Sequence, residues 1–116
     1  MKIAARDLRE EQIARMRGGS GTACFRHIVE RDILGNAARL MAVCTLPPGA
    51  SVGMHSHEKD VEICFFLSGS GLVREGGACE YTVGPGDVSV CEKGSSHEII
   101  NAADQPLEYL ALVLYP

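Results

Sequence analysis

Turn-forming residues interrupt this sequence of 116 residues at short intervals, and their spacing restricts the fold more than any other feature. Between the turns lie segments rich in β-branched, aromatic and other apolar residues. Strands that recur roughly every eight to twelve residues between Gly- and Pro-rich turns are typical of an antiparallel sandwich or barrel. We therefore predict an all-β fold. The turns that define the spacing are Gly35-Asn36, Pro47-Pro48-Gly49, Gly69-Ser70-Gly71, Glu75-Gly76-Gly77, Gly84-Pro85-Gly86-Asp87 and Ala103-Asp104-Gln105-Pro106.

The longest apolar segments indicate which strands are buried and which need to be covered by another part of the protein. Residues 62–68 form an almost unbroken apolar run, which predicts a strand buried on both faces. Residues 40–46 and 107–115 are also long and apolar, and we expect them to be edge strands that need covering. Because a two-fold dimer is the commonest such cover, we expect a homodimer.

The first residues differ in character from the rest. We expect residues 1–21 to form an N-terminal extension and residues 22–116 to form a single barrel domain, since a second domain would bury too small a core. The spacing of Leu8, Ile13 and Met16 is loosely helical, which allows a short helix or turn, and the Gly-rich residues 18–21 end any regular element. An extension with so little apolar surface must dock on the barrel or on a partner subunit, and we expect it to pack across the dimer interface.

Composition excludes several classes of partner. The formal charge of −4 and the pI near 5.5 argue against nucleic acid or an anionic membrane as the main partner. No apolar run approaches the length of a membrane span, and the first residues lack a signal-peptide core, so we expect a cytoplasmic protein. The five cysteines include no C-x-x-C pair, which favours reduced thiols.

Three histidines and one glutamate form a candidate metal site. His55 and His57 are two residues apart, so on a strand both imidazoles leave the same face. Glu62 follows within an apolar run, where an unpaired carboxylate would be costly, and His97 comes from a distant segment. Glu58 and Asp60 are alternative carboxylates, but strand parity favours Glu62. Three imidazoles and a carboxylate suit one divalent Mn, Fe, Co, Ni or Zn ion better than calcium.

Two blocks of residues extend this pattern into a family resemblance. The sequence resembles the cupins, whose first motif is matched at five positions and whose second motif is matched at four. Glu92 stands where the second motif has a proline, and this difference concerns the shape of one turn because that proline is not a metal ligand. The matched positions are Gly49, His55, His57, Glu62 and Gly69 in the first block, and Gly86, Gly94, His97 and Asn101 in the second.

The resemblance implies an antiparallel jelly-roll barrel with a metal centre at His55, His57, Glu62 and His97. Cupins support many chemistries on one fold, and the function we expect is a metal-dependent oxygenation, decarboxylation or isomerisation of a small molecule. The alternative is a metal-containing module that binds or senses a small molecule without turnover. The two classes differ in whether an acid or base lines the cavity.

The residues around the metal suggest what the ligand is. One divalent ion and one carboxylate leave a formal charge of about +1, which favours a small anion of the carboxylate or enediolate type. Cys64 lies two residues after Glu62 and is the candidate catalytic residue, although a packed apolar thiol is the simpler interpretation. Strand parity adds candidate walls, which are Val52, Met54, Cys64, Phe66 and Ile99.

Overall fold

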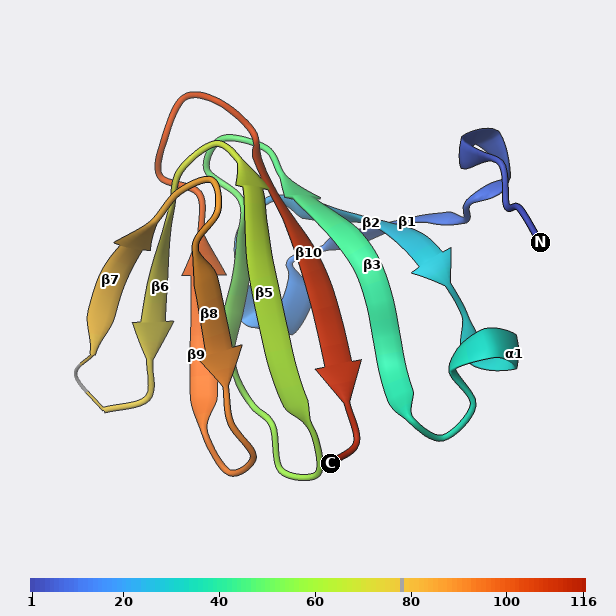
Figure 1. Ribbon diagram of the computed structural model, residues 1–116. Coiled ribbons are helices and arrows are strands. Elements are labelled where there is room, and N and C mark those ends of the chain that lie inside the picture. Colours follow the sequence, from blue (N-terminus) through green and yellow to red (C-terminus); the bar gives the residue numbers. More distant parts are fainter. Residues whose placement is uncertain (78) are drawn as a thin grey trace.

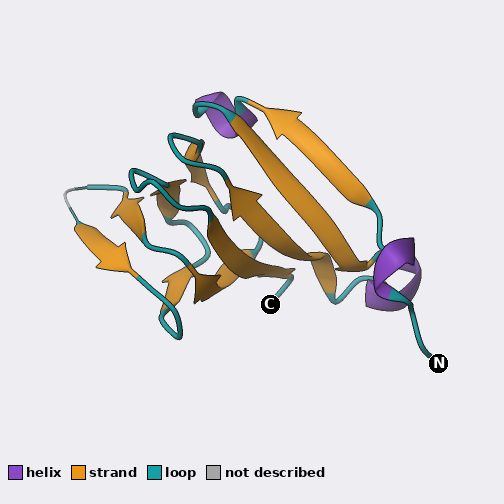
Figure 2. Ribbon diagram, turned by 90° about the horizontal axis from the view of Figure 1, so that it is seen from above, coloured by secondary structure: helices purple, strands orange, loops and turns teal. Residues whose placement is uncertain are grey.

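The computed structural model, which describes residues 1–77 and 79–116, is built almost entirely of β-strands in two antiparallel sheets (Figure 1). Seen from above, the strands make up the body of the molecule and short helical turns lie at its margins (Figure 2). This arrangement confirms the predicted all-β jelly-roll fold. Among the described residues, no helix has the length and apolar character needed to cross a bilayer.

The larger sheet has six strands and the smaller has four. In spatial order, the six-stranded sheet contains β1 (Glu10–Ala14), β2 (Thr22–Val29), β3 (Ala38–Leu46), β10 (Leu107–Leu114), β5 (Val61–Ser68) and β8 (Val88–Cys91). The four-stranded sheet contains β4 (Ser51–Ser56), β9 (Ser96–Ile100), β6 (Gly71–Glu75) and β7 (Glu80–Val83). The remaining elements are the short helical turns η1 (Ala5–Asp7), η2 (Met16–Gly18) and α1 (Arg31–Leu34).

The chain changes sheet at most of its turns from β3 onward, which brings distant segments to the same end of the barrel. β3 is followed by β4 in the other sheet, β5 returns to the first, and β8, β9 and β10 alternate in the same way. Alternate residues of β10 are buried between the sheets, and Tyr109 packs its ring 5.3 Å from that of Phe66. The same alternation directs polar side chains of β4, β5 and β9 into the interior at one end.

The N-terminal extension contains a strand, so the loosely helical interpretation of its apolar spacing is wrong. β1 pairs with β2 in antiparallel register, and Ile13 packs against the core cluster. The strand conformation is favoured here because β2 offers an unpaired edge, and pairing satisfies the backbone groups of both segments. Only η2, at the end of β1, is helical in the region between Leu8 and Gly21.

Two expectations about the apolar strands are also wrong. β3 and β10 are central strands, and the edges of the larger sheet are β1 and β8. β5 is buried on one face only, because Phe65 and Leu67 on the other face are 40% and 39% exposed. The apolar run of β5 therefore faces the core with one set of side chains and the outer surface with the other.

Candidate metal centre

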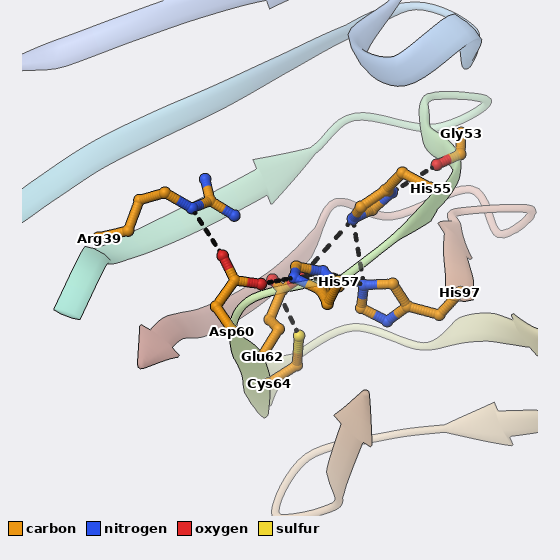
Figure 3. Close-up of polar contacts among 8 residues, drawn as sticks. All are labelled: Arg39, Gly53, His55, His57, Asp60, Glu62, Cys64 and His97. Atoms are coloured by element: carbon orange, nitrogen blue, oxygen red, sulfur yellow. Dashed lines mark hydrogen bonds and ion pairs between the residues drawn. The ribbon is translucent and has the colours of Figure 1, made fainter. Parts of the chain in front are cut away.

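Strand register brings the four predicted site residues together. His55 on β4 lies directly opposite His97 on β9, and the turn after β4 carries His57 back toward the first residues of β5, where Glu62 lies. One ligand atom from each of the four residues falls within 4.8 Å of every other. His57, Glu62 and His97 are buried, and His55 is half-buried. Figure 3 shows the four side chains converging on one point.

The distances within this cluster fit a single small ion. Oε1 of Glu62 lies 2.9 Å from Nε2 of His97, 3.0 Å from Nε2 of His57 and 3.8 Å from Nε2 of His55. Nε2 of His97 lies 3.3 Å from Nε2 of His57 and 3.2 Å from Nε2 of His55. Donor atoms that share a metal at about 2.1 Å lie roughly 3.0 Å apart at a right angle and roughly 3.4 Å apart at the tetrahedral angle. The cluster could therefore hold one divalent ion with little movement.

The hydrogen bonds made by Nδ1 of His55 and Nδ1 of His57 determine that Nε2 of each ring faces the centre of the cluster. Nδ1 of His55 lies 2.7 Å from the carbonyl oxygen of Gly53, and Nδ1 of His57 lies 2.6 Å from Oδ1 of Asp60. Both partners are acceptors, so each Nδ1 is the donor and each neutral ring presents the lone pair of Nε2 to the Glu62 carboxylate. Buried acceptors that point at one another are costly unless a cation lies between them. This donor set fits a metal ion.

The pKa values reflect the same arrangement of groups. Burial acts to raise the pKa of Glu62, but in the metal-free protein the three histidines, which can donate from Nε2 when their rings are protonated, hold it well below its usual range. The hydrogen bond to Glu62 raises the pKa of His57, burial opposes that rise, and the bond to Asp60 adds to it. Glu62 is therefore a carboxylate at neutral pH, which is the form that binds metal.

Asp60 and Arg39 are candidate functional residues that sequence reasoning missed, because the sequence offers Asp60 only as an alternative carboxylate ligand. Asp60 is buried and bridges His57 to Arg39, whose Nε donates to Oδ2 of Asp60 at 3.0 Å. Its position three residues after His57 was the available signal. No signal marked Arg39, which lies where the register of β3 against β10 shifts between Ala38 and Leu40. This β-bulge lets Arg39 reach the site (Figure 3).

Cys64 lies beside the cluster in the buried interior. Its side chain is fully buried, and its thiol donates to Oε2 of Glu62 at 3.5 Å. Burial raises the pKa of this thiol well above its usual range, and the Glu62 carboxylate adds to the rise. A buried, protonated thiol is a poor nucleophile or base. The geometry therefore gives Cys64 a place as a hydrogen-bond donor that orients Glu62.

A cavity of about 30 Å³ lies beside three of the candidate ligands, His55, His57 and Glu62. Of the predicted wall residues, Val52 and Ile99 line it, whereas Met54 is 45% exposed. Met54 turns outward because β4 has a register shift against β9 between Val52 and His55. The remaining lining residues are Met16, Arg17, Phe25, Arg39, Leu40, Tyr109 and Val113.

The motif positions outside the ligand set have structural roles. The corner that has Glu92 in place of proline still closes, because the Ser95 amide donates to the Glu92 carbonyl at 2.9 Å. Gly94 follows with φ of 85°, a backbone conformation that favours glycine. Asn101 is fully buried and its amide donates to the carbonyls of Leu46 and Gln105. These residues hold the loops that support the ligand strands.

Fold and site together define a small double-sheet barrel with a three-histidine, one-glutamate cluster at one end. The chain belongs to the cupin family, since the family model described as Cupin domain matches residues 42–113. This match confirms the resemblance that the two motif blocks indicate.

Two relatives from Thermotoga maritima match nearly the whole chain. The chain is 37% identical to an oxalate-binding protein of Thermotoga maritima over 98% of its own length and 93% of that protein. A crystal structure from Thermotoga maritima, described as a predicted oxalate decarboxylase, superposes with a TM-score of 0.93 at 36% identity and full coverage of both chains. A sugar phosphate isomerase of the cupin superfamily from Silicibacter pomeroyi shares the fold alone, with a TM-score of 0.77, 19% identity, and coverage of 100% of this chain and 76% of that one.

Proposed function

We propose that this cupin binds one divalent transition-metal ion through His55, His57, Glu62 and His97 and uses it to hold a small carboxylate anion. The observation that carries the proposal is the convergence of two imidazole lone pairs on a buried carboxylate. Mn, Fe, Co, Ni and Zn all accept such a donor set. A bound ion of this kind polarises a carboxylate as a Lewis acid and leaves coordination positions for it.

Charge and relatives support a small anionic ligand. The divalent ion and Glu62 sum to a formal charge of about +1 in a cavity with mainly apolar walls, where an anion is favoured. A relative covering almost the whole chain is named an oxalate-binding protein, which supports a carboxylate that can chelate through two oxygens. The cavity of about 30 Å³ is far below the few hundred Å³ typical of drug-sized ligands, which supports a ligand of few atoms.

The residues that line the cavity indicate which class of reaction the site would support. Among the described residues, no imidazole or carboxylate outside the four candidate ligands lines it, and the Tyr109 phenol has a pKa raised well above its usual range by burial. Isomerisation requires a side chain that moves a proton between carbons. The lining therefore favours decarboxylation or oxygenation of the bound carboxylate over isomerisation. The same lack of an acid or base favours a second candidate function, which is binding without turnover.

Ligand titration tests the proposal. Protein loaded with Mn²⁺ is titrated calorimetrically with oxalate, with a 2-oxo acid and with a neutral diol of similar size, and each mixture is assayed for carbon dioxide and peroxide. We expect both acids to bind more tightly than the diol, and only when the metal is present. Equal or tighter binding of the diol would defeat the charge argument. Tight binding of oxalate without any product would favour the binding module.

We also propose that the protein is a homodimer whose subunits meet through the outer face of the larger sheet. Register places apolar outward side chains of four adjacent strands side by side in two rows, which are Val43, Leu110, Phe65 and Val88, and Met41, Leu112, Ile63 and Val90. No charged residue lies within either row on these four strands, although the first row is flanked by Arg26 of β2, which pairs with Glu10 of β1. The neighbouring row, with Thr45, Glu108 and Ser68, is polar and suits an interface rim.

The size of this face is consistent with the centre of a dimer interface. With strands about 4.8 Å apart and rows about 7 Å apart, the two rows cover roughly 300 Å² of the sheet surface. A stable dimer buries about 800 Å² on each subunit, with an apolar centre and a polar rim. The two rows supply that centre.

A further inference from the structure

The N-terminal extension passes over the candidate metal centre. Met16 and Arg17, both in η2, line the cavity together with His55, His57 and Glu62. These two residues come from a segment far from the ligand strands in the sequence. The cavity is therefore completed by the extension and not by the barrel alone.

Close backbone contact holds this segment on β4. A Cβ added at Gly53 would clash with the carbonyl oxygen of Arg17, and one added at Gly19 would clash with that of Ser51. The Ser51 amide donates to the Ser20 carbonyl at 2.8 Å, and the Ser20 amide donates to Oγ of Ser51 at 2.9 Å. These contacts fix where the side chain of Arg17 begins.

Arg17 has a backbone conformation that is unusual for its residue type. Its φ of 54° and ψ of 30° lie in the left-handed region, as do the φ of 50° and ψ of 46° of Arg15. Residues held in this region cost about 1 kcal/mol or more and are concentrated at functional sites. Among the described residues, neither arginine forms an ion pair with a carboxylate. Arg17 lines the cavity and Arg15 does not.

The charges around the cavity can be counted from these contacts. A divalent ion with Glu62 contributes about +1, and Arg39 is neutralised by the carboxylate of Asp60, which it contacts at 3.0 Å. Arg17, an exposed residue that lines the cavity, has no carboxylate partner among the described residues, so it adds a positive charge beside the site and brings the formal sum to about +2. That charge matches a ligand with two negative groups.

We propose that Arg17 makes the site select a small dianion over a monoanion by binding the charge that the metal leaves uncompensated. This inference rests on the proposed function, because it takes the metal and a carboxylate ligand as given. A guanidinium recognises a carboxylate with two parallel hydrogen bonds, which adds specificity as well as affinity. The small cavity restricts the second negative group to within a few atoms of the first, so a short dicarboxylate is the ligand class.

The test compares Arg17→Gly with the matched variant Arg15→Gly. Both substitutions remove one arginine from a left-handed position, where glycine is the less strained residue, so neither is expected to destabilise the fold. Of these two arginines, Arg17 lines the cavity and Arg15 does not. Each Mn²⁺-loaded protein is titrated with oxalate, a dianion, and with glycolate, a monoanion that also chelates through two oxygens. Thermal unfolding and Mn²⁺ affinity are measured on the same samples.

We expect Arg17→Gly to weaken oxalate binding roughly ten- to a hundredfold, the range for a lost charge-assisted hydrogen bond. Its glycolate affinity and Mn²⁺ affinity should change less than threefold, and Arg15→Gly should bind both anions as the unmodified protein does. Unchanged oxalate binding in Arg17→Gly would overturn the inference, as would equal losses in both variants. If the unmodified Mn²⁺-loaded protein binds neither anion, the proposed function itself fails. If it binds both and Arg17→Gly changes neither, only the role of Arg17 fails.

Discussion

Oδ1 of Asp60 lies 2.6 Å from Nδ1 of His57, and the other oxygen of Asp60 accepts a hydrogen bond from Arg39 at 3.0 Å. The carboxylate therefore fixes the His57 ring so that Nε2 faces Glu62, and the arginine fixes the carboxylate. Such outer partners set the tautomer and raise the basicity of a metal-bound imidazole. Two consecutive hydrogen bonds, from Arg39 to Asp60 and from His57 to Asp60, therefore connect β3 to the candidate metal centre.

Replacing Asp60 with Asn should weaken metal binding about ten- to a hundredfold, because outer-shell substitutions at metal-binding histidines have effects of this size. Competition with a chromophoric chelator measures the change. Glu58→Gln is the matched control, since Glu58 is an exposed acid in the same turn. Equal metal affinities for Asp60→Asn and the unmodified protein would show that the hydrogen bond to His57 is not needed for binding.

Removing the candidate ligands should abolish tight metal binding. A His55→Ala, His57→Ala double variant loses two of the four converging donors, so metal content after dialysis should fall to background. Glu92→Pro, which restores the usual residue of the second cupin motif, should retain full metal content because Glu92 contributes only a backbone carbonyl to its turn. Full metal content in the double variant would place the metal elsewhere.

Metal affinity should depend on pH through His57. A proton and a metal ion compete for Nε2, and the hydrogen bond to Glu62 raises the pKa of His57 above its ordinary value of 6.5, with burial opposing and Asp60 adding to the rise. A raised pKa means that the protonated, non-binding form appears on lowering the pH while the solution is still above pH 6.5. Calorimetric titration of metal-free protein with Zn²⁺ between about pH 8 and about pH 5 measures this. Constant affinity over that range would contradict the assignment of His57 as a ligand.

Cys64 should resist thiol reagents in the folded protein. Its side chain is fully buried and its pKa is raised by burial and by Glu62, whereas Cys79 is exposed. Brief treatment with iodoacetamide followed by peptide mass spectrometry should show labelling at Cys79 and none at Cys64. In denaturant both should be labelled, which controls for intrinsic reactivity. Rapid labelling of Cys64 in folded protein would restore it as a candidate nucleophile.

Phe65→Lys should dissociate the proposed dimer, because it places a charge within one of the two apolar rows on the outer face of the larger sheet. Light scattering at micromolar concentration should give a dimer mass for the unmodified protein and a monomer mass for this variant. Ile33→Lys is the control, since Ile33 is 52% exposed on α1 and belongs to neither apolar row. A monomer mass for the unmodified protein would refute the dimer.

Much of the fold and of the candidate site follows from local patterns. Turn residues such as Gly94 mark where the chain reverses, because their backbone conformations are short-range properties. Likewise His55 and His57 share a face because side chains alternate along any strand. The burial of Glu62 could be anticipated from its apolar neighbours alone.

The role of a residue such as Asp60 could not be predicted in the same way. The burial of Asp60 and its hydrogen bond with Arg39 depend on how the turn after β4 folds against Arg39, which is 21 residues away in the chain. The extension was misinterpreted for a similar reason. Its apolar spacing is weakly helical, but pairing with β2 satisfies more backbone hydrogen bonds than a short isolated helix would.

The sequence by itself determined that the chain is all-β, because period and turn chemistry are local, and the two motif blocks placed His55, His57, Glu62 and His97 together through their resemblance to the cupins. Only the tertiary structure decided that Arg39 reaches the site from a β-bulge and that Arg17 lies over the cavity. Both positions depend on contacts between segments distant in the chain. Such contacts are selected by the packing of the whole barrel, and no short stretch of sequence specifies them.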